Sequence, residues 1–315
     1  MRDQWSRRGF FGLCGAAGAT ALLASCSSEE HPDDSAPGPV TIAHIFGETT
    51  VPEPPSRVVC AGYTGQDDLL ALGVVPIAVT NWFGDQPFAV WPWAQRQLGD
   101  AKPVVLDLDN GIAVTQIADL KPDLIIATNA GVDADTYQKL SAIAPTVPQS
   151  GGDAFFEPWK VQAAAIGKAV HRGQQMQSLI DGVDSAFTDV AAARPGFKGK
   201  KVLLLAGRLD QGNVSAASGW RTAFLTQMGL TVAETPPVIE HERIRSALGG
   251  ADVLIWTTES DGERTALLAD PDIAGLESRS IFTTKDQAGA IAFASPLSYP
   301  LVAGQLPALI AKITG

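Results

Sequence analysis

Short apolar runs alternate with helical patterns along two separate stretches of this chain, and this alternation most restricts the folds open to it. In the first stretch, residues 58–61 and 123–128 have the pattern of strands, the second of them buried on both faces. Helical patterns over residues 67–72 and 135–143 follow them. This order predicts a parallel sheet with helices on both faces.

A second stretch repeats the pattern towards the C-terminus. Strands are expected at residues 201–206, 251–257 and 291–294, and helices at 222–228, 244–248 and 300–313. Between the two stretches, apolar residues fall at helical spacing over residues 158–170 and 174–192, with Gly173 as a candidate break. The second of these helical segments alone would span about 30 Å.

The predicted fold class is therefore α/β, with two Rossmann-like lobes built on parallel sheets and joined by a long, rigid interlobe helix. The expected division is a twin-arginine lipoprotein signal over residues 1–25, a disordered tether over 26–39, an N-terminal α/β lobe over 40–157, the interlobe helix over 158–195 and a C-terminal α/β lobe over 196–315.

The first 39 residues carry the features of an exported, anchored protein. Arg7 and Arg8 precede a run of Gly, Ala and Leu, which is typical of a twin-arginine signal. Small residues before Cys26 resemble the lipobox of bacterial lipoproteins, whose cysteine carries a diacylglyceryl group that anchors the protein to the outer face of the cytoplasmic membrane. A transmembrane anchor is the alternative, but residues 9–25 are short and rich in Gly and Ala, whereas a span takes about 20 apolar residues. The polar, proline-rich residues 27–39 predict a flexible tether.

Charge and cysteine content exclude several classes of protein. After residue 25 the chain has 20 basic and 33 acidic side chains, and this net charge of −13 argues against a nucleic-acid partner. Cys60 lies in an apolar strand pattern, so we expect a buried, inert thiol and, with Cys26 lipidated, no intramolecular disulfide. No two histidines stand at ligand spacing, so we expect no metal bound directly by the protein.

Several segments, in this order, resemble one family of transport proteins. They are VPEPPSRVV at residues 51–59, DDLLALGV at 67–74, LKPDLI at 120–125, YQKLSAIAPTV at 137–147, FLTQMGL at 224–230 and SPLSYP at 295–300. Over residues 40–315 the chain is similar to the class III solute-binding proteins of ABC importers for iron-siderophores, haem and cobalamin. The likeness is greatest to mycobacterial iron-siderophore-binding lipoproteins.

The resemblance implies that cargo is held between two lobes and delivered to an ABC permease. Iron would arrive inside a bound siderophore, with no intrinsic cofactor. In this family an exposed acid on each lobe pairs with arginines of the permease. Asp133 or Asp135 would serve in the first lobe, and Glu240 or Glu242 in the second; solvated acids without this role are the alternative.

Residues that directly follow the predicted strands are candidates for the cleft, because ligands of parallel α/β sheets bind at the carboxyl ends of the strands. The ligand-binding candidates are Tyr63, Thr64, Gln66, Trp82, Phe83, Trp91, Asn129, Phe156, Trp159, Arg208, Trp220, Arg221 and Ser298. Glu259 follows a strand in the same way. We expect Trp82 and Trp91 to offer flat apolar surface to a ligand; the alternative is that these rings seal the core of the lobe.

Charge narrows the cargo. Only Arg208 and Arg221 add positive charge at cleft positions. Two arginines among many aromatic residues suit a bulky chelate with little net charge, such as a hydroxamate or a mixed phenolate-hydroxamate siderophore of the carboxymycobactin type. Haem is the alternative cargo, because the phenolate of Tyr63 could hold its iron. For Arg221, a contact within its own lobe is the alternative to contact with the ligand.

Catalysis is the rival class of function, but no motif supports it. The chain has no Gly-x-Ser-x-Gly elbow, and no Gly-x-Gly-x-x-Gly follows a strand. Asp67 and Asp68 lie at a helix start, where the helix dipole favours acidic side chains. We therefore expect a binding protein rather than an enzyme.

Overall fold

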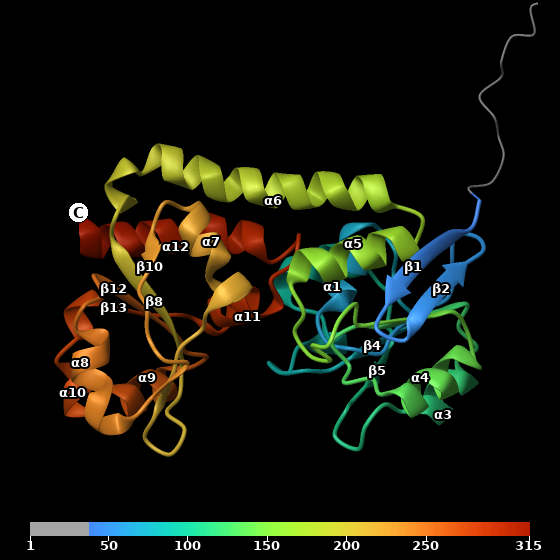
Figure 1. The fold of residues 1–315 in the computed structure, drawn as a ribbon, viewed down its shortest axis with the longest axis horizontal. Coiled ribbons are helices and arrows are strands. Elements are labelled where there is room, and N and C mark those ends of the chain that lie inside the picture. Colours follow the sequence, from blue (N-terminus) through green and yellow to red (C-terminus); the bar gives the residue numbers. More distant parts are fainter. Residues whose placement is uncertain (1–37) are drawn as a thin grey trace, which may run out of the picture. The chain divides into compact units, whose positions relative to one another are not determined.

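The computed structural model describes residues 38–315 (Figure 1). The predicted export signal, the lipidation site Cys26 and most of the predicted tether lie outside the described residues. The described part begins with an antiparallel hairpin made of β1 (Val40–His44) and β2 (Gly47–Val51). This hairpin precedes the first predicted strand and packs against the first lobe through β7 and α5.

The first lobe is built on a five-stranded parallel sheet in the order β5-β4-β3-β6-β7. Its strands are β3 (Val58–Cys60), β4 (Ala78–Thr80), β5 (Val104–Leu106), β6 (Leu124–Ala127) and β7 (Thr146–Pro148). Its helices are α1 (Gly65–Ala71), α2 (Gln95–Leu98), α3 (Val114–Asp119), α4 (Ala134–Ser141) and α5 (Trp159–Ala169). Every residue of β3 and β6 is buried, which explains their continuous apolar sequences.

The second lobe has a four-stranded parallel sheet in the order β10-β8-β12-β13 and a small antiparallel pair. The strands are β8 (Lys201–Ala206), β9 (Val214–Ser215), β10 (Thr231–Val232), β11 (Val238–Ile239), β12 (Val253–Thr257) and β13 (Ser280–Phe282). The helices are α7 (Ala223–Gln227), α8 (Ile244–Leu248), α9 (Asp261–Leu268), α10 (Pro271–Ala274), α11 (Lys285–Phe293) and α12 (Tyr299–Thr314). The α/β fold class predicted from the sequence is confirmed.

Six short 3-10 helices complete the described secondary structure. They are η1 (Pro87–Ala89), η2 (Pro92–Ala94), η3 (Pro195–Phe197), η4 (Gly219–Thr222), η5 (His241–Arg243) and η6 (Glu277–Arg279). The first two lie in the aromatic segment of the first lobe, which is otherwise a loop. Its prolines stand at the first position of each 3-10 helix, where a missing N–H costs no hydrogen bond.

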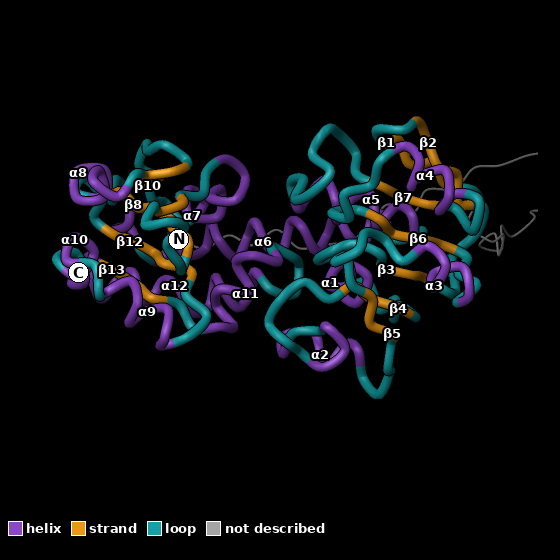
Figure 2. Tube along the Cα trace, turned by 90° about the horizontal axis from the view of Figure 1, so that it is seen from below, coloured by secondary structure: helices purple, strands orange, loops and turns teal. Residues whose placement is uncertain are grey.

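A long helix, α6 (Gly173–Ala193), connects the two lobes (Figures 1 and 2). The predicted helical region therefore holds two helices, because the chain turns at His171, whose φ is 56°, and α5 stays with the first lobe. One face of α6 is buried in an apolar core that both lobes share, through Met176, Ile180, Val183 and Phe187. This is the stripe that the helical spacing of apolar residues predicts.

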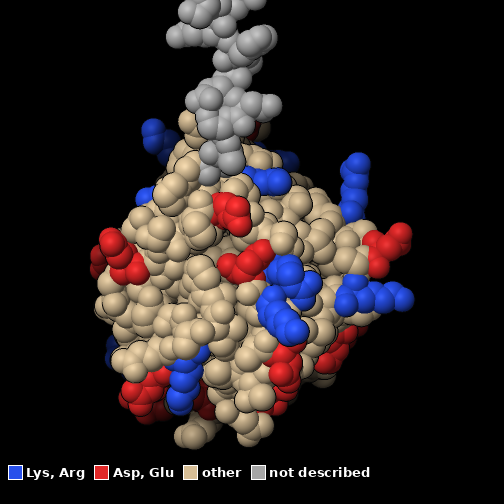
Figure 3. All heavy atoms as spheres, turned by 90° about the vertical axis from the view of Figure 1, so that its right-hand side faces the viewer, with Lys and Arg blue, Asp and Glu red and all other residues tan. Residues whose placement is uncertain are grey.

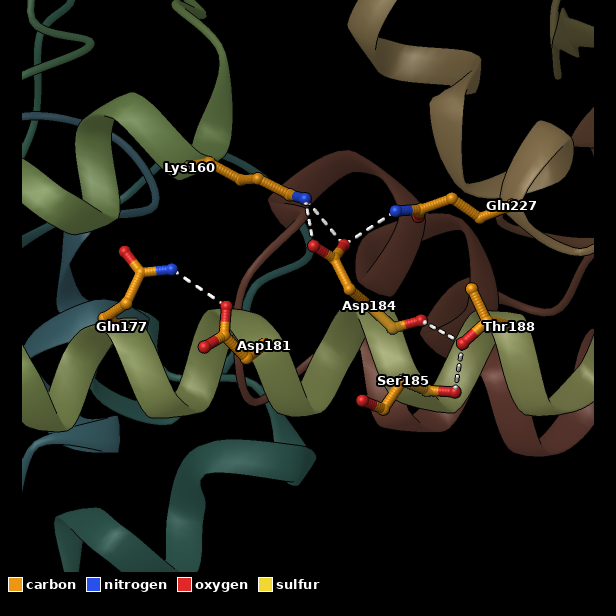
Figure 4. A network of polar contacts seen from close by, with 7 residues as sticks. All are labelled: Lys160, Gln177, Asp181, Asp184, Ser185, Thr188 and Gln227. Atoms are coloured by element: carbon orange, nitrogen blue, oxygen red, sulfur yellow. Dashed lines mark hydrogen bonds and ion pairs between the residues drawn. The ribbon is translucent and has the colours of Figure 1, made fainter.

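A polar contact on α6 also links the two lobes (Figure 4). The Asp184 carboxylate accepts from Lys160 Nζ of α5, at 2.6 and 2.5 Å from its two oxygens. Gln227 Nε2 of α7 donates to the same carboxylate over 2.7 Å. One side chain of α6 thus binds a helix of each lobe.

The strand predicted at residues 291–294 is wrong. Residues 285–293 form α11, and the last strand of the sheet is β13, which precedes it. The run Ala-Gly-Ala-Ile-Ala-Phe is apolar enough for either structure, but a capping box starts a helix here: Thr284 Oγ1 accepts from the Gln287 N–H, and Gln287 Oε1 accepts from the Thr284 N–H. In the sequence, Thr284 and Gln287 are the residues that identify the start of this helix.

Candidate functional site

A cavity of about 450 Å³ lies where the second lobe meets two aromatic residues of the first. The second lobe supplies most of its wall, from the carboxyl ends of β8 and β12, from residues 215–221 and from α11. Phe83 and Phe156 come from the first lobe. The wall is largely apolar, and its charged side chains are Arg221 and Glu259. This placement agrees with the rule that ligands bind at the carboxyl ends of parallel strands.

Aromatic rings of the first lobe form one cluster beside the cavity. Tyr63 stacks on Trp82, with ring centroids 5.5 Å apart, and Trp82 lies 4.9 Å from Phe156. Phe83 meets Trp82 edge-on at 4.6 Å. Phe155, which is exposed, stacks on Tyr63 at 6.1 Å. The rings together make a rigid aromatic wall at low conformational cost.

Asn129 holds Phe156 in place. Its Oδ1 accepts from the N–H groups of Phe156, at 2.7 Å, and of Glu157, at 3.2 Å. Its Nδ2 donates to Thr64 Oγ1, which also accepts from Gln162 Nε2. The φ of Phe156 is 60°, a strained value for an aromatic residue, and these bonds fix it. Asn129 and Thr64 are buried and position the aromatic wall from behind.

Arg221 connects the two sides of the cavity. Its guanidinium lies 5.0 Å from the ring centroid of Phe156 in the first lobe and 5.4 Å from that of Trp220 in its own lobe. Cation–π attraction holds a guanidinium over aromatic faces, and its charge is not neutralised by an ion pair. The cavity therefore presents one oriented cation between aromatic rings.

The structure separates the predicted ligand contacts into four groups. Phe83, Phe156, Trp220 and Arg221 line the cavity, and Tyr63 and Trp82 stack directly behind them. The buried side chains, which support the loops, are Thr64, Gln66, Trp91, Asn129, Trp159 and Ser298. Arg208 lies outside the cavity wall, where its exposed side chain pairs with Glu263 at 3.3 Å.

Trp91 does not offer its face to the cavity, contrary to the expectation from sequence. It is 1% exposed and stacks on Trp93 with centroids 4.9 Å apart. A Cβ built on Gly84 or on Gly289 would stand 2.4 or 2.5 Å from the indole. The absence of side chains at these two glycines lets the indole fit between the first lobe and α11 of the second. The sequence shows the two glycines, but only the fold shows that both stand against Trp91.

Sequence reasoning also missed one face of α11. Ala288, Ile291 and Ala292 of this helix line the cavity, while Gly289 and Phe293 pack on the tryptophans of the first lobe. One side of α11 therefore lines the cavity, and an adjacent side of the helix packs on the first lobe. Because residues 291–294 were expected to form a strand, the helical spacing of this segment could not be used.

Asp67 and Asp68 lie in the first turn of α1, at the helix start expected from the sequence, and both are buried. Asp67 Oδ2 accepts from Trp93 Nε1 and from Ser295 Oγ, both at 2.7 Å, and Asp68 Oδ2 accepts from Gln162 Nε2 at 2.9 Å. Burial raises the pKa of Asp67 to about 6, against the effect of its two hydrogen bonds. Burial also raises the pKa of Asp68 well above its usual value.

The Tyr63 hydroxyl and the Cys60 thiol have raised pKa values and are protonated at neutral pH. Burial, together with the charges of Asp109 and Asp107, raises the pKa of the Tyr63 hydroxyl. Burial raises the pKa of the Cys60 thiol to about 12, and this cysteine is buried as predicted. Within residues 38–315, no cluster of three His, Cys, Asp or Glu side chains could hold a metal ion.

The acids considered for permease contact are all exposed. Asp133 caps α4, accepting from the Thr136 N–H at 2.7 Å, and this bond lowers its pKa; Asp135 follows in the first turn. Glu240 and Glu242 lie at η5 in the second lobe. On the end of the first lobe seen in Figure 3, acidic and basic side chains are interspersed. Among the described helices, none is both long and apolar enough to cross a membrane.

Several curated relatives of the chain are named for binding iron chelates or siderophores. It is 32% identical over 178 residues to a probable siderophore-binding lipoprotein, YfiY, of Bacillus subtilis, covering 55% of this chain and 52% of that protein. It is 27% identical over 192 residues to the Fe(3+) dicitrate-binding periplasmic protein FecB of Escherichia coli, covering 61% and 62%. The chain thus matches only about half to three fifths of the length of these relatives.

Solved structures match nearly the whole described chain. A periplasmic solute-binding protein of Mycobacterium smegmatis is 64% identical, with a TM-score of 0.87, over 88% of this chain and 99% of that one. PiaA of Streptococcus pneumoniae, solved with ferrichrome, is 22% identical with a TM-score of 0.70, over 87% and 98%, and shows the shared fold. The resemblance stated from the sequence is confirmed.

The family model described as "Periplasmic binding protein" matches residues 58–271, which include most of both lobes and all of α6. Its members are binding proteins rather than enzymes, in agreement with the expectation from sequence. The chain therefore belongs to the periplasmic binding protein family.

Proposed function

We propose that this protein is an extracytoplasmic, lipid-anchored substrate-binding protein that captures a ferric siderophore and delivers it to an ABC importer. The observation that carries the proposal is the cavity lined by Phe156 and Arg221, where an aromatic wall of one lobe meets an oriented cation of the other. The names of the relatives support iron chelates as the class of ligand.

The composition of the cavity wall favours a chelate of low net charge. Arg221 is the one cation among the side chains that line it, and most of the rest are apolar. Burying a charged group without a partner is costly, so a tris-catecholate chelate with three negative charges would be poorly matched. A ferric hydroxamate, or a mixed phenolate-hydroxamate chelate of the carboxymycobactin type, is well matched.

A fluorescence titration of the purified protein tests this proposal. The chain has seven tryptophans, and Trp82 and Trp220 lie beside the cavity. We expect ferric hydroxamate or mycobactin-type chelates to quench this fluorescence at micromolar concentration or below, and a ferric tris-catecholate to quench it less. Absence of quenching by every chelate would overturn the siderophore proposal, and a Soret shift on addition of haem alone would replace it with haem binding.

Lipid anchoring is tested separately, through Cys26. The Cys26→Ser variant should lose incorporation of labelled fatty acid and move from the membrane fraction to the soluble fraction. Cys60→Ser is the matched control, because the Cys60 thiol is buried, and it should stay anchored. Retention of Cys26→Ser at the membrane would contradict the anchor.

Delivery to a permease is tested through the exposed acids. Asp135→Lys and Glu242→Lys change one charge on each lobe and leave the helix cap at Asp133 intact. We expect the double variant to bind chelate normally and to fail in chelate uptake by cells. Normal uptake would remove Asp135 and Glu242 from the proposed contact and leave Asp133 and Glu240 as the candidates.

A further inference from the structure

The ligand cavity has an acidic side chain in its wall, Glu259. This residue follows β12, is half-buried, and also lines an adjoining cavity of about 300 Å³. Its N–H donates to Glu263 Oε2 at 2.6 Å, and the neighbouring Thr258 hydroxyl donates to the Thr283 carbonyl at 2.7 Å. The backbone at Glu259 is therefore held in place, and its side chain lies where the two cavities meet.

The carboxylate of Glu259 makes no hydrogen bond or ion pair with any residue that the structure describes. Two cations nearby have other contacts: Arg208 pairs with Glu263 at 3.3 Å, and Arg264 pairs with Glu277 at 3.0 Å and lies 5.2 Å from the Phe282 ring centroid. Lys285 and Asp261 line only the adjoining cavity, with one charge of each sign. The carboxylate of Glu259 is thus left to water or to a ligand.

A ligand that fills the cavity removes water from both Arg221 and Glu259. An anionic or neutral ligand leaves the Glu259 carboxylate poorly solvated and unpaired, which opposes binding. A ligand with a cationic group restores a partner through a charge-assisted hydrogen bond. The cavity therefore favours ligands that carry a positive group in addition to the part that meets Arg221 and the aromatic wall.

We propose that Glu259 selects ferric hydroxamate chelates that carry a pendant ammonium group, which its carboxylate binds. This inference rests on the proposed function and specifies the class of siderophore within it. The bulky, uncharged hydroxamate core lies against the aromatic wall, and the ammonium group reaches the junction of the two cavities.

The test compares two ligands that differ in one charge. Ferrioxamine B has a pendant primary ammonium, and its N-acetyl derivative keeps the same iron centre without that charge. The wild-type protein should bind ferrioxamine B about tenfold more tightly, the effect of one charge-assisted hydrogen bond. Glu259→Gln should bind both ligands with the affinity that the wild type has for the acetylated one. Asp261→Asn, two residues away and outside the ligand cavity, should keep the wild-type preference.

The outcomes separate this inference from the proposed function. Equal affinities of the wild type for the two ligands, or an unchanged preference in Glu259→Gln, would overturn the role of Glu259. Binding of ferrichrome or a mycobactin-type chelate without binding of ferrioxamine B would also overturn it, while the proposed function stands. Failure of all ferric chelates to bind would overturn the proposed function itself.

Discussion

Ser295 of the second lobe donates its hydroxyl hydrogen to the buried carboxylate of Asp67 in the first lobe, over 2.7 Å from Oγ to Oδ2. Trp93 Nε1 donates to the same oxygen, so the carboxylate joins the aromatic loop of the first lobe to the segment between α11 and α12. Asp67 Oδ1 has no hydrogen-bond partner among the described residues. The lobes are thus linked at Asp67 as well as along α6, and this link contains a titratable group.

The stability of the protein should depend on pH through Asp67. The pKa of this carboxyl is about 6 in the folded protein against 3.8 for an ordinary aspartate. A raised pKa means that the folded state binds the proton more tightly, so the stabilisation is complete below about pH 4 and is lost as the pH rises through about 6. The loss amounts to about 3 kcal/mol, at 1.36 kcal/mol for each pKa unit.

The Asp67→Asn variant tests this dependence, because an amide can still accept from Ser295 and Trp93 but does not titrate. In urea unfolding, the free energy of the variant minus that of the wild type should rise by about 3 kcal/mol between pH 4 and pH 7. Asp68, whose pKa is raised in the same direction, is present in both proteins and largely cancels. If the unfolding free energies of the variant and the wild type changed with pH in parallel, Asp67 would not be the titrating group.

The contact of α11 with Trp91 should be intolerant of a single methyl group. A Cβ at Gly289 would lie 2.5 Å from Trp91 Cη2, and the buried indole has no room to move. We expect Gly289→Ala to lower the free energy of unfolding by about 1–3 kcal/mol, as overpacking in a core does. Gly304→Ala in α12 is the matched control, since its Cβ would meet nothing within 4 Å. It should be neutral or stabilising by up to about 1 kcal/mol. Similar temperatures of thermal unfolding for the two variants would refute the close fit of α11 against Trp91.

The contact of Asp184 with both lobes should contribute to stability more than a neighbouring acid does. Asp184→Asn loses the ion pair with Lys160 of α5 and weakens the bond from Gln227 of α7 (Figure 4). Since these side chains are partly exposed, we expect a loss of about 1 kcal/mol. Asp181→Asn, whose partner Gln177 lies on the same helix, should change stability less. Equal losses of unfolding free energy in chemical denaturation would mean that the contact of Asp184 with both lobes adds no stability.

Arg221 should matter for ligand binding, whereas Arg208 should not. Arg221→Ala removes the guanidinium that lies over Phe156 and Trp220, and we expect about a tenfold loss of affinity for a bound ferric chelate. Arg208→Ala removes an exposed arginine that pairs with Glu263 outside the cavity, so affinity should stay within about twofold of the wild type. Both values come from fluorescence titration. Loss of affinity in Arg208→Ala alone would place the ligand elsewhere.

The sequence predicts the sheets better than it predicts side-chain burial. Residues 201–206 form β8 as expected, and the apolar stripe of α6 is buried, because periodicity reports local structure and its apolar face. Periodicity fails for residues 291–294, where a uniformly apolar run fits a strand or a helix and only the capping residues decide.

Strand ends identify the neighbourhood of the cavity but not which side chains reach it. Phe156 and Arg221 lie in its wall, whereas Gln66 turns inward and donates to the Ala89 carbonyl at 3.2 Å. Trp91 is buried because Gly84, seven residues before it, and Gly289 of the other lobe make room for it. The partner of Asp67, Ser295, is 228 residues away in the sequence. Contacts of this kind depend on how the two lobes meet, which local sequence does not specify.

The location of iron in the loaded protein tests the account most directly. Crystals of the protein grown with the ferric chelate that quenches most strongly would give an anomalous signal at the iron absorption edge. We predict one iron peak per chain inside the cavity, with the chelate against Phe156 and Arg221. An iron peak on the outer surface of either lobe, with the cavity lined by Phe156 and Arg221 free of chelate, would contradict the account.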